Sequence, residues 1–74
     1  MDLSSCRLGD RVLFRVGHVP TWIRGTVTRT ESTVFDVIVH VAERTEDGKI
    51  VGTGTWPFKK GNKWDEERIK PDPE

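Results

Sequence analysis

The amino-acid sequence predicts an all-β domain, a small and strongly bent β-barrel of five strands with one short helical turn before the last strand. Three observations predict it. Apolar and polar residues alternate in several short runs, turn-forming residues separate these runs, and glycines recur inside them. Alternation places every second side chain on one face of a strand, and an interior glycine lets a strand bend or lets another backbone approach closely.

The first two strands are expected at residues 11–16 and 21–29. A Gly-Asp turn signal precedes the first, and Gly17 and Pro20 end it. In the second strand Gly25 falls on the inward face, where it would let the strand bend to close a small barrel. Trp22 and Arg24 fall on the outward face. The expected inward residues of the two strands are Val12, Phe14 and Val16, then Ile23, Gly25 and Val27.

The longest alternating run predicts a third strand at residues 34–43, after a polar turn at residues 30–33. Its expected inward residues are Phe35, Val37, Val39 and Val41. Glu-Asp-Gly at residues 46–48 then indicates a hairpin, because glycine readily adopts positive φ.

The last part of the chain is less regular. A fourth strand is expected at residues 49–58, although it contains Gly52 and Gly54. A basic loop follows, and Asp65 is the expected cap of a single helical turn. Residues 69–70 would form the last strand.

Length, charge and cysteine content limit the function classes. The chain of 74 residues is expected to be one domain, with a lead-in at 1–8 and a frayed tail at 71–74. Twelve basic residues balance twelve acidic ones, which argues mildly against nucleic acid as the main partner. The single cysteine, Cys6, excludes an internal disulfide and suits a reducing cytoplasm. No apolar run reaches the length of a membrane span, so no membrane association is expected.

Four segments of the chain resemble parts of a known family, the SH3-like barrels, especially their Tudor-like and KOW-like members. Leu-Gly-Asp-Arg-Val-Leu-Phe resembles the opening strand, Trp-Ile-Arg-Gly-Thr-Val the second and Phe-Asp-Val-Ile-Val-His-Val the third. Trp-Asp-Glu-Glu-Arg-Ile-Lys-Pro resembles the closing turn and the last strand. The resemblance spans residues 8–71 and implies a five-stranded SH3-like barrel. The chain has no tyrosine and only Trp22 matches an aromatic of the methyl-reading cage, so methyl recognition is not carried over.

The aromatic residues supply the candidate binding site. Three tryptophans are many for so short a chain, and two of them flank a basic loop. Aromatic and basic residues together can grip a partner side chain or a nucleic acid, whereas packing at the barrel ends and a solvated loop are the simpler interpretations. Trp56 is expected to pack in the core. The candidate binding residues are Trp22, Arg24, Phe58, Lys59, Lys60, Lys63 and Trp64.

These observations favour a non-enzymatic binding or adaptor module with a protein partner. Nucleic-acid binding through the same residues is the alternative. No catalytic residues, metal ligands or cofactor are expected, because no spacing typical of such sites occurs. An enzyme would need a site shared between subunits, and a homo-oligomer is left open. Small barrels of this kind are often encoded by phages and other mobile elements, which suggests a host-interacting accessory protein.

Arginines of the first two strands form a second feature. Arg11, Arg15, Arg24 and Arg29 are expected to line up on the outer surface. Cross-strand pairing with Asp36 or Glu43 is the simpler interpretation. The alternative is that the arginines meet an acidic partner.

Overall fold

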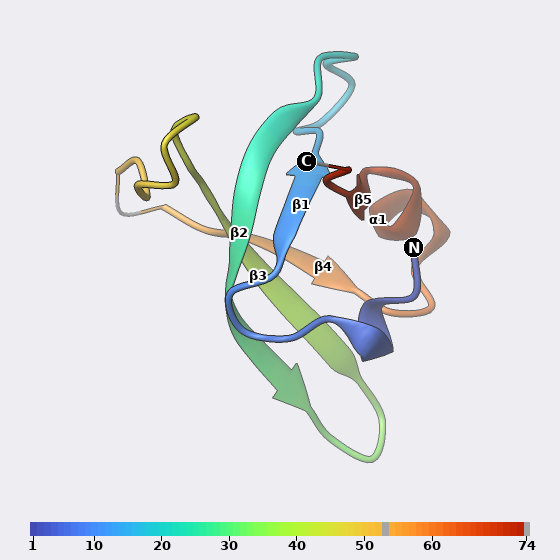
Figure 1. Cartoon of the computed structure of the whole chain (residues 1–74). Helices are drawn as coiled ribbons and strands as arrows, with labels where there is room; N and C mark the ends of the chain where they lie inside the picture. The colour runs from blue at the N-terminus through green and yellow to red at the C-terminus, as the bar shows by residue number, and fades with distance from the viewer. Residues whose placement is uncertain (53, 74) are drawn as a thin grey trace.

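The computed structural model describes residues 1–52 and 54–73, and its main feature is an antiparallel sheet curled into a half-barrel (Figure 1). The strands are β1 (Arg11–Phe14), β2 (Ile23–Ser32), β3 (Val37–Glu43), β4 (Trp56–Lys59) and β5 (Ile69–Pro71). Their order in the sheet is β4-β3-β2-β1-β5, so the last strand returns to lie beside the first. A 3-10 helix, η1 (Leu3–Ser5), precedes the sheet, and α1 (Lys63–Glu67) connects β4 to β5. The all-β prediction is confirmed, and the curled sheet is compatible with an SH3-like barrel.

Every strand contributes to one apolar core. Alternation predicted the inward residues of the first three strands correctly at most positions, and Phe58 and Ile69 add to them from β4 and β5. Leu3 of η1 is also fully buried, so the lead-in covers part of the core rather than extending into solvent. The fully buried side chains are Leu3, Val12, Phe14, Val27, Val39, Val41, Phe58 and Ile69.

Gly25 lies at a crowded place in the core. A Cβ atom at this position would lie 2.5 Å from Val41 Cγ1 and 2.7 Å from Phe14 Cε1. These two side chains come from the strands on either side of β2, and they meet over the bare glycine backbone. Gly25 is therefore a point of close approach, but the groups that approach it are side chains of the two neighbouring strands and not another backbone.

The connection between β2 and β3 differs from the prediction. β2 continues to Ser32, and the turn covers the next four residues, not residues 30–33. Thr33 Oγ1 accepts hydrogen bonds from the backbone N–H groups of Phe35 (3.2 Å) and Asp36 (3.0 Å). This side-chain turn replaces ladder hydrogen bonds, as threonine often does locally. Phe35 therefore lies at the hairpin tip, 90% exposed, and its predicted inward position is wrong.

The predicted fourth strand at residues 49–58 is also too long. Only Trp56–Lys59 form β4, and Ile50 makes an isolated bridge to Arg44. Gly52 has a φ value of 70°, which an extended strand does not allow. Thr53, which falls inside the predicted strand, lies outside the described residues.

The helical turn before β5 is capped by a different residue from the one predicted. Asn62 Oδ1 accepts a hydrogen bond from the backbone N–H of Asp65 at 3.3 Å, so Asn62 is the N-cap and α1 begins at Lys63. The Asp65 carboxylate instead accepts a hydrogen bond from the backbone N–H of Lys59 at 3.0 Å. It thereby ties the helix to β4.

The C-terminal segment is anchored by a buried ion pair. Pro71 belongs to β5, and the side chain of Asp72 pairs with Arg44, each of the two side chains being only 3% exposed. Arg44 Nε also donates to the carbonyl oxygen of Gly25 at 3.1 Å. The predicted frayed tail is therefore wrong at residues 71 and 72, because a buried charge needs a fixed partner. Glu74 lies outside the described residues.

The crowding at Gly25 can be tested by adding a single methyl group. Gly25→Ala is expected to lower the free energy of unfolding by about 1–3 kcal/mol, because Val41 and Phe14 must move away from the new Cβ. Gly54→Ala is the matched control, since its Cβ would meet nothing within 4 Å, and it should change stability by less than about 0.5 kcal/mol. Urea unfolding followed by tryptophan fluorescence measures both, and equal effects would contradict the assignment.

The placement of two phenylalanines gives a second test. Phe35→Ala at the exposed tip should change the free energy of unfolding by less than about 0.5 kcal/mol. Phe58→Ala, which empties a core position that is 1% exposed, should lower it by about 3–5 kcal/mol. Circular dichroism during urea unfolding compares them. A large loss in the Phe35 variant would show that this side chain is packed after all.

Candidate binding surface

Trp22 lies on the outer face of the sheet, where two cations contact its ring. Ile23 pairs with Phe14 on the inner face, so the adjacent residues Trp22 and Arg15 both lie outward. Arg15 Cζ lies 4.8 Å and Lys70 Nζ 4.1 Å from the centroid of the indole ring. Both contacts are within the range of cation–π attraction. The side chains of Arg15, which immediately follows β1, and of Lys70 in β5 therefore meet at a tryptophan that immediately precedes β2.

Trp64 is held at the surface by Arg68. Arg68 Cζ lies 5.0 Å from the Trp64 ring centroid and 5.4 Å from that of Phe58. The guanidinium donates to the backbone oxygens of Trp64 (3.3 Å) and Arg15 (3.1 Å) and pairs with Asp65 at 2.7 Å. Arg68 is thus a brace between α1 and β1, and it fixes a tryptophan that remains 45% exposed.

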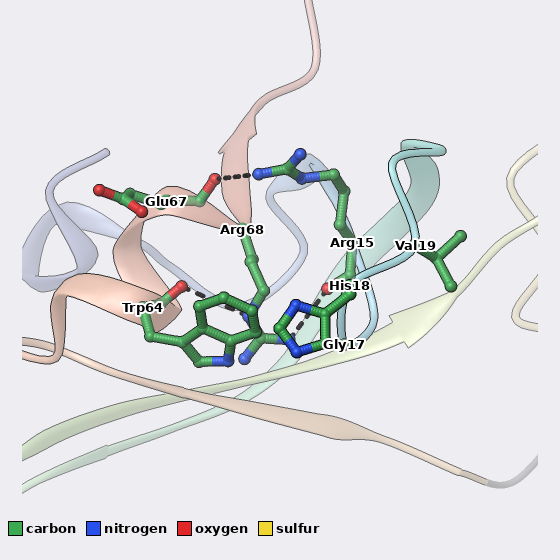
Figure 2. A pocket seen from close by; sticks show the side chains of 7 residues that line it. All are labelled: Arg15, Gly17, His18, Val19, Trp64, Glu67 and Arg68. Carbon is green, nitrogen blue, oxygen red and sulfur yellow. Dashed lines mark hydrogen bonds between the residues drawn. The ribbon is translucent and has the colours of Figure 1, made fainter.

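A shallow depression of about 140 Å³ lies beside Trp64 (Figure 2). His18 packs edge-on against Trp64, with ring centroids 5.0 Å apart. Arg15 Nη2 donates to the backbone oxygen of Glu67 at 3.2 Å, whereas Figure 2 shows the Glu67 carboxylate pointing away from Arg15. Arg15 therefore contacts Trp22 and also lines the depression that contains Trp64. We name the set Arg15, His18, Trp22, Trp64 and Lys70 the Trp22–Trp64 surface.

The predicted binding residues do not form a single patch. Trp22 and Trp64 are brought together through Arg15, but Phe58 is buried in the core, and its predicted surface role is wrong. Lys59 pairs with Asp36 at 3.1 Å, and the backbone N–H of Lys60 donates to the oxygen of Val37 at 2.9 Å. These two lysines therefore lie by the β2–β3 hairpin.

The remaining two predicted residues lie at the margins of the surface. Arg24 is on the outer face, opposite Leu13 in the sheet, and its guanidinium lies 3.8 Å from the Glu46 carboxylate. Lys63 is the exposed first residue of α1, immediately before Trp64. In the sheet, Leu13 separates Arg24 from Lys70 of the Trp22–Trp64 surface.

The predicted row of arginines on the outer surface of the first two strands is present only in part. Arg11, Arg15 and Arg24 have the outward register, but a register shift between Val27 and Arg29 interrupts the pattern. Arg29 pairs with Glu31 on its own strand. Among the described residues, Glu46 pairs with Arg24 and Glu31 with Arg29, whereas Asp36 pairs with Lys59.

The sequence did not indicate His18, Arg68 and Lys70 as binding residues. It also did not indicate that Arg15 lies beside the two tryptophans. Lys70 follows the inward residue Ile69, so alternation could have placed it outward. The pairing of β5 with β1, which brings Lys70 to Trp22, has no local signal in the sequence. His18 lies in a loop, where no periodicity applies.

The surroundings of Cys6 and Glu31 displace the pKa values of these two groups. Burial raises the pKa of the Cys6 thiol, so this group is a poor nucleophile at neutral pH. A hydrogen bond from His40 at 3.2 Å, together with the nearby Arg29, lowers the pKa of Glu31. Residues 1–52 and 54–73 contain no group of three or more His, Cys, Asp or Glu side chains that could hold a metal ion. No helix in this part of the chain has the length and apolar character needed to cross a membrane.

Comparisons of the chain with protein-family models, with curated proteins and with solved structures find no match. The function is therefore inferred from the geometry of the chain itself.

The bracing role of Arg68 can be tested with its closest substitute. Arg68→Lys keeps the charge but loses the planar fork, so it should lower the free energy of unfolding by about 1.5–3 kcal/mol. Arg29→Lys is the control, because this exposed side chain pairs only at the surface and should change stability by less than about 0.5 kcal/mol. Thermal and urea unfolding give both values. Indistinguishable variants would rule out the brace.

Proposed function

We propose that this chain is a non-enzymatic binding or adaptor module that recognises a protein partner through the Trp22–Trp64 surface. The observation that carries the proposal is the exposure of Trp64 on a fixed support. Its ring stacks on Arg68, contacts His18 and still leaves 45% of the residue open to solvent. Tryptophan and arginine are the residue types most enriched where protein interfaces gain their affinity.

Rigid presentation of the aromatic rings supports this proposal. Arg68 is hydrogen-bonded to two backbone oxygens and to a carboxylate, so Trp64 is held by a group that is itself fixed. The Trp22 ring likewise contacts two cations, Arg15 just after β1 and Lys70 in β5. A side chain that is ordered before binding loses less conformational entropy when the complex forms. Such a surface suits recognition better than a pair of mobile rings would.

The size of the depression beside Trp64 supports docking of a partner side chain there. Its volume of about 140 Å³ accommodates one side chain of a partner. Small-molecule sites usually enclose about 300–1,000 Å³. The side chains around it are Arg15, His18, Val19, Trp64, Glu67 and Arg68, which can orient a partner side chain.

The resemblance of residues 8–71 to Tudor-like and KOW-like SH3-like barrels supports the same class of function, because such barrels commonly serve as binding modules. We extend the proposal to a cytoplasmic accessory protein encoded by a phage or another mobile element. The single cysteine supports the reducing compartment.

Nucleic acid is the second candidate partner, and the cations at Trp22 favour it. Two observations favour a protein instead. Lys59, expected to contact phosphates, is paired with Asp36 and lies by the hairpin. The chain as a whole carries no net positive charge, whereas nucleic-acid binders are usually basic.

Selection from a random peptide library displayed on phage tests the proposal even though the partner is unidentified. The wild-type chain should enrich peptides that bind it, and Trp64→Ala should weaken the binding of those peptides at least about tenfold, as expected for a central aromatic anchor. Phe35→Ala is the matched control, because it removes another exposed aromatic ring at the far hairpin tip. Its affinity should stay within about twofold of the wild type.

Two results would contradict the proposed function. One is a selection that enriches no peptide while a single-stranded oligonucleotide binds with a steep salt dependence, which would favour nucleic acid. The other is a loss of peptide binding in Phe35→Ala with retention in Trp64→Ala. That pattern would move the binding site to the hairpin.

A further inference from the structure

We propose that the partner feature recognised by this surface is an acidic, extended peptide segment whose carboxylates bind to Arg15 and Lys70 beside Trp22. The inference rests on the proposed function, and it adds the chemistry of the ligand. It is carried by the arrangement of cations on the outer face of β1, β2 and β5.

Two cations share one aromatic ring at this surface. Arg15 and Lys70 lie 4.8 and 4.1 Å from the centroid of the Trp22 indole. Two like charges that share one ring repel each other, and the ring only partly compensates them. Carboxylates bound to these two cations would offset this repulsion. The site is therefore matched in charge to an anion.

Arg15 also has unused hydrogen-bonding capacity. Its Nε is buried and has no hydrogen-bond partner among the described residues. A different nitrogen of the same guanidinium, Nη2, donates a hydrogen bond to the backbone oxygen of Glu67 at 3.2 Å. An unsatisfied buried donor is costly, and a carboxylate can accept two parallel bonds from an arginine. A small outward rotation of Arg15 would let a bound carboxylate satisfy Nε.

The spacing of charges along the sheet matches an extended ligand. Lys70 and Arg24 both pair with Leu13, so one row across the outer face reads Arg24, Leu13, Lys70. Arg15 lies two residues after Leu13, just beyond the end of β1, which is about 7 Å at the usual rise of a strand. In an extended peptide, residues i and i+2 are separated by the same distance. Acidic residues at alternate positions would therefore meet both rows.

The carboxylate of Glu67, which lines the same depression as Arg15, leaves room for such a ligand. The Glu67 carboxylate points away from Arg15 (Figure 2). A phosphate backbone is also anionic, but base stacking needs open ring faces, and the Trp22 ring already carries two cations. Carboxylates are therefore favoured over nucleic acid.

Binding of synthetic peptides to the full chain tests the inference. The probe is a fluorescein-labelled peptide of six glutamates flanked by glycines, and its control has six glutamines. The glutamate peptide should bind at least about tenfold tighter at low salt, and its affinity should fall as salt rises. A thymidine 12-mer of single-stranded DNA serves as the nucleic-acid probe.

Matched variants locate the site. Lys70→Ala should weaken binding of the glutamate peptide about threefold, and the double variant Arg15→Gln, Lys70→Ala at least about tenfold. The control double variant Arg29→Gln, Lys60→Ala removes the same side-chain types from outside the surface, and it should change affinity by less than about twofold. Circular dichroism verifies that each variant is folded, and Lys70→Ala, an exposed position, keeps the test valid if the double variant is not.

The outcomes separate the inference from the proposed function. Equal affinities for the glutamate and glutamine peptides, or equal losses of affinity in the two double variants, would overturn the inference that the ligand is acidic. If library peptides still depend on Trp64 in that case, the proposed function stands without it. If the thymidine 12-mer binds more tightly than the glutamate peptide and displaces it, the inference is wrong and the surface recognises nucleic acid.

Discussion

The close packing over Gly25 is the constraint on which the rest of this structure depends. Phe14 from β1 and Val41 from β3 meet over this residue, and only the absence of a Cβ lets them do so. The carbonyl oxygen of Gly25 is used as well, because it accepts a hydrogen bond from Arg44. One residue thus lets two core side chains meet and also accepts a hydrogen bond from a buried arginine.

The geometry of the binding surface follows from this constraint. Arg44 pairs with Asp72 immediately after β5, which helps to hold that strand beside β1. The position of β5 in turn brings Lys70 to Trp22, which lies three residues before Gly25. Core packing and a buried ion pair therefore place two cations and a tryptophan on the opposite face of the same sheet. The positions of the side chains on the outer face thus depend on the packing of the core on the inner face.

Much of the fold could be predicted from alternation alone. The inward positions of Val12, Phe14 and Val27 were correct, because a strand with one buried face has an unambiguous period. The predicted inward position of Phe35 is wrong because Thr33 forms a turn through its side chain. The apolar and polar residues still alternate in the sequence there, but the backbone at Phe35 is no longer a strand. The burial of Phe58 was missed because aromatic residues beside lysines suggest a surface.

The candidate site could be predicted only in part, for a different reason. Trp22 and Trp64 were identified from residue type, but their neighbours depend on which strands pair. Lys70 reaches Trp22 because β5 returns to β1, and Arg68 reaches both Trp64 and the backbone of Arg15 for the same reason. Long-range pairing of this kind is set by the whole core and leaves no local signal in the sequence.

The most direct test of the central claim is the response of the three indole N–H signals in a ¹H–¹⁵N correlation spectrum when a selected peptide is added. Each tryptophan gives one such signal, so the spectrum reports on exposed and packed rings separately. We predict that the Trp22 and Trp64 signals shift, while that of Trp56, which packs against Phe14, stays in place. Shifts confined to Trp56, or to the backbone amides of Val34 and Phe35, would contradict this prediction.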